Sequence, residues 1–267
     1  MILFNDICGG LISLGWIKLI EFERPKVIDG TLIQGLPGLG FVGKIAVDYV
    51  IEILKLPKFA ELYSDYLLLA DGRAGVYVDL KGILDLPRYE FYLFKEKNII
   101  FLAGNTQPVS WAQYEIAEKV IKYVRELGVS RIITLGGTVT PSRKKEVYTA
   151  TTNEKLMDML RKYDVKKSIG GAITGAAGIM LGISKLYNMD GFTLLGNVGK
   201  IYPDVEAAKA VLTVISKMYE FKIDFSKMDK IIEDIKIKSK AAGELTALIE
   251  RERTEREKEK ETRQYYV

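Results

Sequence analysis

The stretch VIDGTLIQGLPGLGFVGKIAVDYVIEIL, residues 27–54, joins a strand pattern to a helix pattern through a glycine-rich turn. Residues 27–34, which end at the turn, are predicted to form a β-strand. Residues 41–54 place apolar side chains at helical spacing, and Pro57 follows shortly after their end. A strand that leads through a tight turn into a helix predicts an α/β fold.

The same alternation of strands and helices continues along the chain. Further strands are expected at residues 75–80, 83–94, 99–103, 131–135 and 192–196. Further helices are expected at residues 110–127, 153–162 (capped by Asn153), 175–187 and 204–220. Short, continuously apolar strands suit a sheet that is buried on both faces. We therefore predict a sheet that contains parallel strands and carries helices on both faces.

The C-terminal region has a different composition. Apolar residues recur at roughly helical spacing from residue 228 to 249, which predicts a helix. Twelve of the fourteen residues from Glu250 to Arg263 are charged, six of each sign, which predicts a solvated stalk with no apolar face to dock. We divide the chain into an apolar N-terminal arm (1–24), an α/β core domain (25–225), a C-terminal helix and charged stalk (226–263) and a tail (264–267).

The N-terminal arm lacks the features of a targeting segment. It has no basic region before its apolar residues and no A-x-A-like cleavage site, and its apolar part is short for a membrane span. Two interpretations stay open: a mobile or docked extension of the chain, or a contact within an oligomer.

Composition excludes several classes of function. The 267-residue chain has no histidine, which excludes Ser-His-Asp and Cys-His nucleophile systems and zinc sites that contain histidine. Its single cysteine, Cys8, excludes disulfide frameworks and indicates a reducing compartment, so we expect a cytoplasmic protein. A net charge of +4, without a basic stripe interleaved with aromatic residues, does not indicate nucleic-acid binding. We expect no metal site, no cofactor and no membrane partner.

The glycine-rich turn allows a nucleotide interpretation. Gly38, Gly40 and Gly43 fit the G-x-G-x-x-G pattern of dinucleotide-binding loops, between a strand and a helix. In another register, Gly38 to Lys44 fits G-x-x-x-x-G-K, but Ile45 stands where Mg²⁺ binding needs Ser or Thr. The alternative is a tight turn whose glycines permit positive φ and close packing. We favour the turn, and keep a nucleotide site at Gly38, Gly40, Gly43 and Lys44 as the rival hypothesis.

Several separate segments carry a resemblance to one family. They are residues 35–44 (GLPGLGFVGK), 104–108 (GNTQP), 134–137 (TLGG), 147–153 (VYTATTN), 174–178 (TGAAG), 194–197 (LLGN) and 202–204 (YPD). With them, the sequence resembles the proteasome assembly chaperone family, in its archaeal homo-oligomeric branch. The resemblance implies a three-layer α/β/α sandwich like that of purine nucleoside phosphorylases, no catalytic activity and a homo-oligomer, with a homotetramer suggested.

The last three residues, Tyr265, Tyr266 and Val267, resemble the hydrophobic-Tyr-any motif with which proteasome regulators enter pockets between α-subunits of the core particle. In such a pocket the α-carboxylate of Val267 would pair with a lysine, and Tyr266 would supply a ring and a hydroxyl. Tyr265 would add apolar area, although an aromatic residue at this position departs from the aliphatic one of the motif. The resemblance therefore implies the α-subunits of the proteasome core particle as partners.

The sequence thus predicts a non-enzymatic, ATP-independent protein that binds the proteasome through its C-terminal tails. Assembly chaperone and gate-opening activator both fit, because both use such tails. Two enzymes are the rivals: an ATP- or dinucleotide-dependent enzyme that uses the glycine-rich loop 35–44, and a nucleoside phosphorylase or hydrolase suggested by fold analogy alone. The absence of histidine counts against the second rival.

Overall fold

The computed structural model describes residues 15–199 and 202–238. The chain divides into two compact units, Met1–Ile223 and Asp224–Val267. The first unit holds the sheet and its helices, and the second holds the start of the C-terminal helix.

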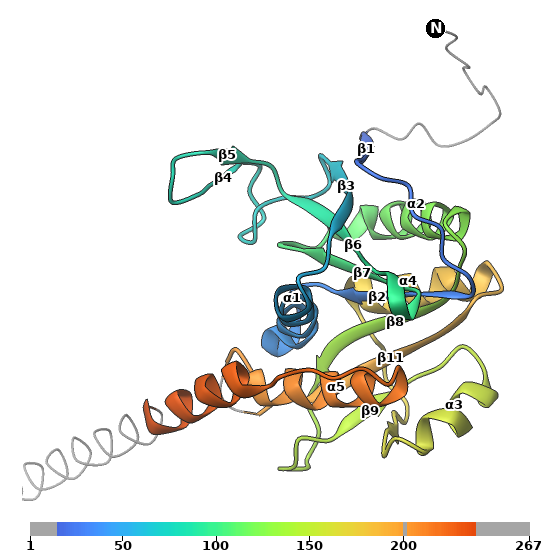
Figure 1. Cartoon of the computed structure of the whole chain (residues 1–267), viewed down its shortest axis with the longest axis vertical. Coiled ribbons are helices and arrows are strands. Elements are labelled where there is room, and N and C mark those ends of the chain that lie inside the picture. The colour runs from blue at the N-terminus through green and yellow to red at the C-terminus, as the bar shows by residue number, and fades with distance from the viewer. Residues whose placement is uncertain (1–14, 200–201, 239–267) are drawn as a thin grey trace, which may run out of the picture. The chain divides into compact units, whose positions relative to one another are not determined.

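Nine strands of the described residues form one mixed sheet (Figure 1). In spatial order they are β1 (Ile17–Glu21), β3 (Lys58–Ser64), β6 (Arg88–Phe94), β7 (Ile99–Gly104), β2 (Gly30–Gly35), β8 (Val129–Thr138), β11 (Asp190–Asn197), β9 (Val147–Thr149) and β10 (Lys166–Lys167). The central strands β7, β2, β8 and β11 are parallel, whereas β1, β3 and β6 form an antiparallel edge. Loops that follow the parallel strands therefore meet at one edge of the sheet.

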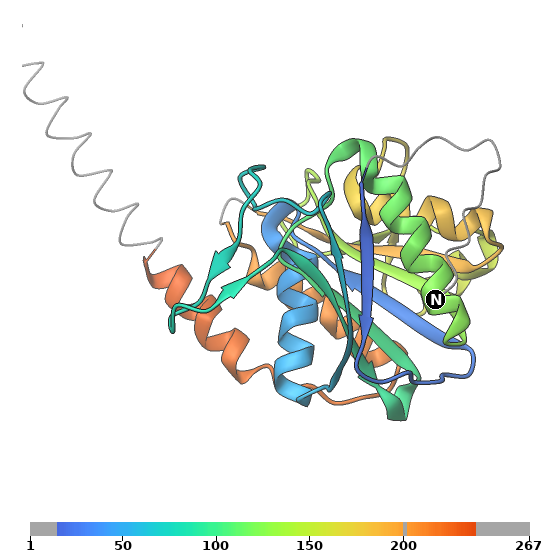
Figure 2. The same ribbon diagram turned by 90° about the horizontal axis from the view of Figure 1, so that it is seen from above.

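Helices cover both faces of the sheet. α1 (Val42–Leu54) and α5 (Val205–Met218) lie together against one face, and α2 (Gln113–Glu126) and α4 (Gly175–Leu186) lie together against the other (Figures 1 and 2). The short α3 (Glu154–Arg161) begins at Asn153, whose side-chain oxygen accepts a hydrogen bond from the Leu156 amide. The predicted three-layer α/β/α sandwich is confirmed.

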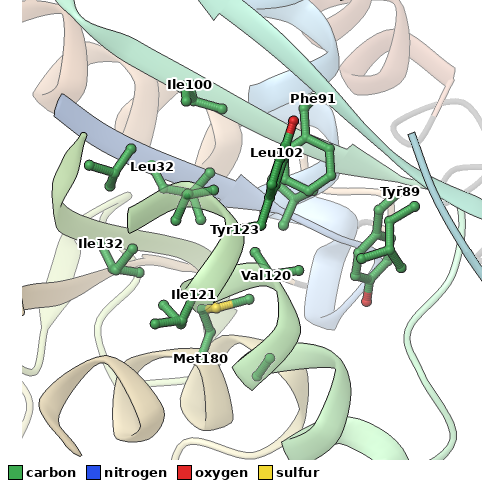
Figure 3. Close-up of a cluster of buried hydrophobic side chains, with 14 of the residues drawn as sticks. Leu32, Tyr89, Phe91, Ile100, Leu102, Val120, Ile121, Tyr123, Ile132 and Met180 are labelled. Atoms are coloured by element: carbon green, nitrogen blue, oxygen red, sulfur yellow. The ribbon is translucent and has the colours of Figure 1, made fainter. Parts of the chain in front are cut away.

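The buried core between the sheet and α2 and α4 is apolar (Figure 3). It is built from strand residues Leu32, Phe91, Ile100, Leu102 and Ile132 and helix residues Val120, Ile121, Tyr123 and Met180. The rings of Phe91 and Tyr123 meet edge to face, with centroids 5.3 Å apart. Alternate strand residues point to opposite faces, so Ile33 and Ile133 of the same strands face α1 and α5.

Most of the predicted helices and central strands are present within a few residues of their expected bounds, but the two outer strands of the antiparallel edge, β1 and β3, were missed. Strand β3 carries Lys58 and Glu61, which interrupt its apolar pattern. Residues 17–21 pair with β3, although the sequence assigned residues 1–24 to an arm. Residues 1–14 of that arm lie outside the described part of the chain.

The strands expected at 75–80 and 83–94 are wrong in extent. Instead, β4 (Tyr77–Val78) and β5 (Leu84–Asp85) pair as a short separate hairpin, and β6 begins only at Arg88. Pro87 precedes β6 and has no backbone N–H to offer to a ladder, which explains why one long strand does not form. In the second unit, residues 226–238 are helical, and the Asp224 carboxylate accepts a hydrogen bond of 2.9 Å from the Ser226 amide.

Candidate functional site

The glycine-rich loop between β2 and α1 makes a sharp left-handed turn. Gly40 has φ +64° and Phe41 has φ +54°. A Cβ on Gly40 would lie 2.9 Å from Val198 Cγ2, so both the backbone conformation and the space require glycine at this position. The turn therefore has a structural need for Gly40, whether or not a ligand is bound.

Two other glycines let α1 approach the sheet closely. A Cβ on Gly35 would overlap the Gly43 carbonyl oxygen, and a Cβ on Gly43 would overlap the Leu135 carbonyl oxygen. These contacts bring the first turn of α1 against β2 and β8. The Gly43 position of the G-x-G-x-x-G pattern thus serves helix–sheet packing.

Lys44 follows in α1 and is held by three oxygen atoms. Its Nζ donates to Asn105 Oδ1 at 3.0 Å and to the Gly104 carbonyl at 3.3 Å, and it pairs with Asp48 Oδ2 at 2.7 Å. Burial raises the pKa of Asp48 above its usual value, although Lys44 acts against this rise. A phosphate-loop lysine must reach a phosphate at the turn, whereas this one is bound at the end of β7.

A cavity of about 450 Å³ lies beside the loop. Its lining comes from the loop (Leu36, Gly38, Leu39), the ends of β2, β8 and β11 (Gln34, Leu135, Gly136, Gly137, Leu195) and the N-terminus of α4 (Thr174, Gly175, Ala177), together with Gln107 and others. Five of the segments that carry the family resemblance, 35–44, 104–108, 134–137, 174–178 and 194–197, meet around this cavity. In the sequence they are far apart.

Gln107 links the glycine-rich loop to α4 across the cavity. Its Nε2 donates to the Pro37 carbonyl, and its Oε1 accepts from the Ala176 amide at 3.0 Å. The segment GNTQP was noted in the sequence, but nothing there assigned a role to its glutamine. Only the fold brings Gln107 between two loops that lie 69 and 70 residues away.

The loop that carries the basic run Arg143-Lys144-Lys145 is fixed by contacts of its backbone and of the Lys145 side chain. Lys145 forms an ion pair with Asp204, which is 4% exposed and also accepts from the Gly199 amide at 2.7 Å and the Ala207 amide at 2.9 Å. Asn197 Nδ2 donates to the Ser142 and Lys144 carbonyls at 2.7 and 2.9 Å. These contacts fix the loop after β8 and cap α5, so Lys145 has a structural role.

Charged side chains on β3 and β6 neutralise one another. Glu61, 7% exposed, pairs with Lys58 and lies 3.1 Å from Arg88 Nε, and Glu90 lies 2.8 Å from Arg88 Nη2. Burial, together with the Tyr63 hydroxyl's hydrogen bond to Glu61, raises the pKa of Tyr63 to about 12. Glu61 and Glu90 both have cationic partners, so this cluster offers no free carboxylate for acid–base chemistry.

The β4–β5 hairpin carries a large exposed apolar surface. Figures 1 and 2 show it extending away from the main sheet. Its exposed apolar residues are Val76, Val78, Leu80, Ile83, Leu84 and Leu86. The Asp79 carboxylate shapes its tip by accepting from the Lys81 and Ile83 amides at 2.8 and 2.9 Å. The alternation of Val76, Val78 and Leu80 indicates a strand with one apolar face, but the sequence did not reveal that the other described residues would leave this face uncovered.

The predicted docking residues Tyr265, Tyr266 and Val267 lie outside the described residues, as do 239–263 of the predicted stalk. Within residues 15–199 and 202–238, no group of three or more Cys, Asp and Glu side chains is placed to hold a metal ion. No helix in the described part of the chain is both long enough and apolar enough to cross a membrane.

The comparisons with known proteins agree on one family. Residues 32–241 match the PAC2 family. An uncharacterized protein of Methanocaldococcus jannaschii is 36% identical over 207 residues, which cover 76% of this chain and 78% of that protein. Pyrococcus furiosus PbaB, an archaeal proteasome activator, has a crystal structure that matches with a TM-score of 0.76 at 33% identity, covering 85% of this chain and 98% of PbaB.

The monoclinic crystal structure of Pyrococcus furiosus PbaA, an archaeal homolog of proteasome-assembly chaperone, matches with a TM-score of 0.73 at 24% identity. The match covers 94% of this chain and 99% of PbaA. At that identity the likeness shows a shared fold.

Proposed function

The chain belongs to the PAC2 family, and from this we propose that it is a non-enzymatic, ATP-independent cytoplasmic protein that binds the proteasome core particle. The observation that carries the proposal is the 33% identity to PbaB, an archaeal proteasome activator, over 98% of that chain. The same observation favours activation of the core particle over assistance in its assembly.

We propose that Tyr265, Tyr266 and Val267 dock into pockets of the core-particle α-ring. The support is chemical: the tip combines two aromatic rings with a terminal carboxylate. A segment of fourteen residues, 250–263, of which twelve are charged, separates the tip from the core domain. One tail has only three residues to bury and would bind weakly. Several tails on one oligomer would gain through effective concentration.

The β4–β5 hairpin supports self-association, with a second copy of this chain as the occupant of its apolar face. The hairpin pairs only two residues from each strand, and such a hairpin is marginally stable by itself, so packing against a second copy would stabilise it. Obligate homo-oligomer interfaces are the more apolar ones, and the six exposed aliphatic side chains of the hairpin fit such an interface. We propose a homo-oligomer, with four copies as the expected number.

The nucleotide-dependent enzyme is the less favoured rival. Gly40 and Gly43 are needed by the turn and by helix packing, and Lys44 is already bound by Asp48, Gly104 and Asn105. Gly38 is the least constrained of the four, because a Cβ there would meet only Gln107 Nε2, at 3.6 Å. No observation on the loop requires a phosphate.

Native gel electrophoresis with purified core particle tests the tail. The wild-type chain should co-migrate with the core particle and raise its peptide hydrolysis, whereas deletion of residues 265–267 or Tyr266→Ala should abolish both. One glycine added after Val267 keeps the rings and displaces the carboxylate by about 3.5 Å, and should weaken binding as well. Lys260→Ala, a change in the stalk, is the matched control. Wild-type binding by the deletion variant would remove the tail from the mechanism.

Multi-angle light scattering tests the hairpin. Leu80→Asp with Leu84→Asp should reduce the oligomer to smaller species, because both side chains lie on the exposed apolar face. Lys81→Glu changes charge at the same tip without removing apolar area, and should leave the mass unchanged. An unchanged mass for the double variant would place the self-contact elsewhere on the chain.

A further inference from the structure

Helix α4 lacks the charged outer face that α1, α2 and α5 have. Lys185 is the only charged residue among its twelve, whereas α1, α2 and α5 carry three, six and three charged residues. A helix that is apolar on all sides is normally covered on all sides. Yet Leu186 of α4 is 76% exposed, and a Cβ added to Gly182 would meet no atom within 4 Å. The described residues therefore leave an apolar side of α4 uncovered.

The uncovered side of α4 continues onto the start of α2. Trp111, in the turn before α2, is 77% exposed, and Tyr114 is 61% exposed. Tyr114 lies one turn before Glu118, which accepts a hydrogen bond from the Tyr187 hydroxyl at the end of α4, so Tyr114 is on the side of α2 that faces α4. We call the combined surface the α4 face, and none of its side chains is charged. Its residues are Trp111, Tyr114, Ile179, Gly182, Ile183 and Leu186, the last four at helical spacings of three and four.

The described residues begin close to this face. Gly15 packs directly on the Tyr66 ring, since a Cβ on Gly15 would lie 2.3 Å from Tyr66 Cζ. The Tyr66 carbonyl accepts a hydrogen bond of 3.0 Å from the Val109 amide, two residues before Trp111. Beyond the other end of β1, Arg24 pairs with the last residue of α2 at 2.7 Å. Strand β1 therefore runs alongside α2 (Figure 2), and the chain enters it at the end where Trp111 is exposed.

The residues before Gly15 have the composition of a segment that needs cover. Residues 1–14 read MILFNDICGGLISL: nine of the fourteen are apolar, and Asp6 carries the only charged side chain. Removing apolar side chains from water is favourable. Fourteen extended residues reach up to about 46–50 Å, which exceeds the width of two helices of about 10–12 Å each. The segment is therefore long enough to cross the start of α2 and reach Leu186 on α4.

We propose that residues 1–14 pack, within the same chain, across Trp111 and Tyr114 and onto the α4 face. Apolar side chains of the segment cover Leu186 and fill the open space over Gly182. A second copy of the chain is a less favoured occupant, because the segment is tethered beside the face and has the higher effective concentration there. The contact makes the N-terminal arm a docked extension of its own chain and does not rest on the proteasome proposal.

Tryptophan fluorescence tests this contact, because Trp16 and Trp111 are the only two tryptophans of the chain. In a Trp16→Phe background, the emission reports on Trp111 alone. Deletion of residues 1–14 should shift this emission to longer wavelength and increase its quenching by acrylamide, because Trp111 loses its cover. Unchanged emission and quenching after the deletion would overturn the proposal.

Two single substitutions in the full chain connect the fluorescence to the α4 face. Leu186→Asp should shift the emission of Trp111 in the same direction as the deletion, because a charge opposes burial of the face. Ile28→Asp is the matched control, because Ile28 is also 76% exposed but lies just before the amino end of β2, whereas Trp111 lies beyond the carboxyl end of β7. The control should leave emission and quenching unchanged. Equal effects of the two substitutions would contradict docking on α4.

Cross-linking identifies the chain that provides the segment. Cys8 is the only cysteine, and Gly182→Cys places a second thiol on the α4 face where a side chain has free space. A bismaleimide should join the two thiols within one chain, so mass spectrometry should find the bridged peptides in a gel band of single-chain mass. Lys217→Cys, at an exposed position of α5 on the opposite face of the sheet, is the matched control and should be bridged far more slowly. A two-chain product would assign the face to a neighbouring copy, and equal rates for the two variants would show no docking; either result would overturn the proposal.

Discussion

Replacing Gly40 with alanine should destabilise the fold much more than replacing Lys44 with alanine. An L-residue in the left-handed region costs about 1–2 kcal/mol, and Gly40 has φ +64°. The added Cβ would also lie 2.9 and 3.1 Å from the two methyl groups of Val198, an overpacking that costs about 1–3 kcal/mol. We expect Gly40→Ala to lower the free energy of unfolding by about 3 kcal/mol.

Lys44→Ala removes the ion pair with Asp48 and the hydrogen bonds to Asn105 and the Gly104 carbonyl, all made by a partly exposed side chain, and should cost about 1 kcal/mol. A change of 1 kcal/mol shifts the melting temperature of a domain of this size by roughly 2–4 °C. Scanning calorimetry should therefore show a loss of roughly 6–12 °C for Gly40→Ala and less than about 4 °C for Lys44→Ala. Similar small losses for both would refute the account of the turn. ATP or NAD binding at micromolar affinity in the wild type, lost in Lys44→Ala, would establish the nucleotide site instead.

Three further outcomes are expected. Burial alone would raise the pKa of Glu90, but its two cationic partners outweigh burial and lower the pKa below its usual 4.5. The stabilisation from Glu90 is then present above pH 4.5 and lost as the pH falls through the lowered value, so urea titrations should show a smaller acid loss for Glu90→Gln. Asp204→Ala should lower the free energy of unfolding by about 2–4 kcal/mol, because it removes the cap of α5 and the oxygen atoms that accept from Lys145 and the Gly199 amide. Asp204→Asn can still cap the helix, so calorimetry should show a smaller loss. Deletion of residues 1–21 should lower the melting temperature more than deletion of residues 1–14, because only the longer deletion removes β1 and the Ser64 hydrogen bond to the Trp16 carbonyl. Equal melting temperatures for the two deletions would show that β1 adds no stability.

The sequence predicted the parts of the fold whose signals are local. The run IIFLA at 99–103 is apolar throughout, and β7 is buried throughout. Asn153 was expected as a cap and makes the capping bond. Strand β3 was missed because its Lys58 and Glu61 look like surface residues, whereas the fold places Arg88 and Glu90 of the adjacent strand beside them. A charge pair between strands cannot be recognised before the strands are paired.

The cavity shows the same limit more strongly. Each segment around it is recognisable in the sequence, but which polar side chain is left unpaired depends on all of them together. Gln34 and Gln107 are equivalent as sequence letters. The Gln107 amide forms hydrogen bonds with the Pro37 carbonyl and the Ala176 amide, whereas the Gln34 amide has no partner among the described residues. This difference therefore exists only at the level of tertiary structure.

Self-association and tail docking should be coupled if the proposed mechanism holds. A smaller oligomer carries fewer tails, so the hairpin variant Leu80→Asp with Leu84→Asp should bind the core particle weakly although Tyr265, Tyr266 and Val267 are intact. Linking several weak contacts raises avidity by about 10²–10⁴-fold without any new contact, and the hairpin variant should lose a factor of this order. The tail deletion should lose binding and keep its oligomer mass. Binding by the hairpin variant at wild-type strength, measured by titration on native gels, would show that fewer tails or the core domain itself suffices, and the hairpin would then have no part in proteasome recognition.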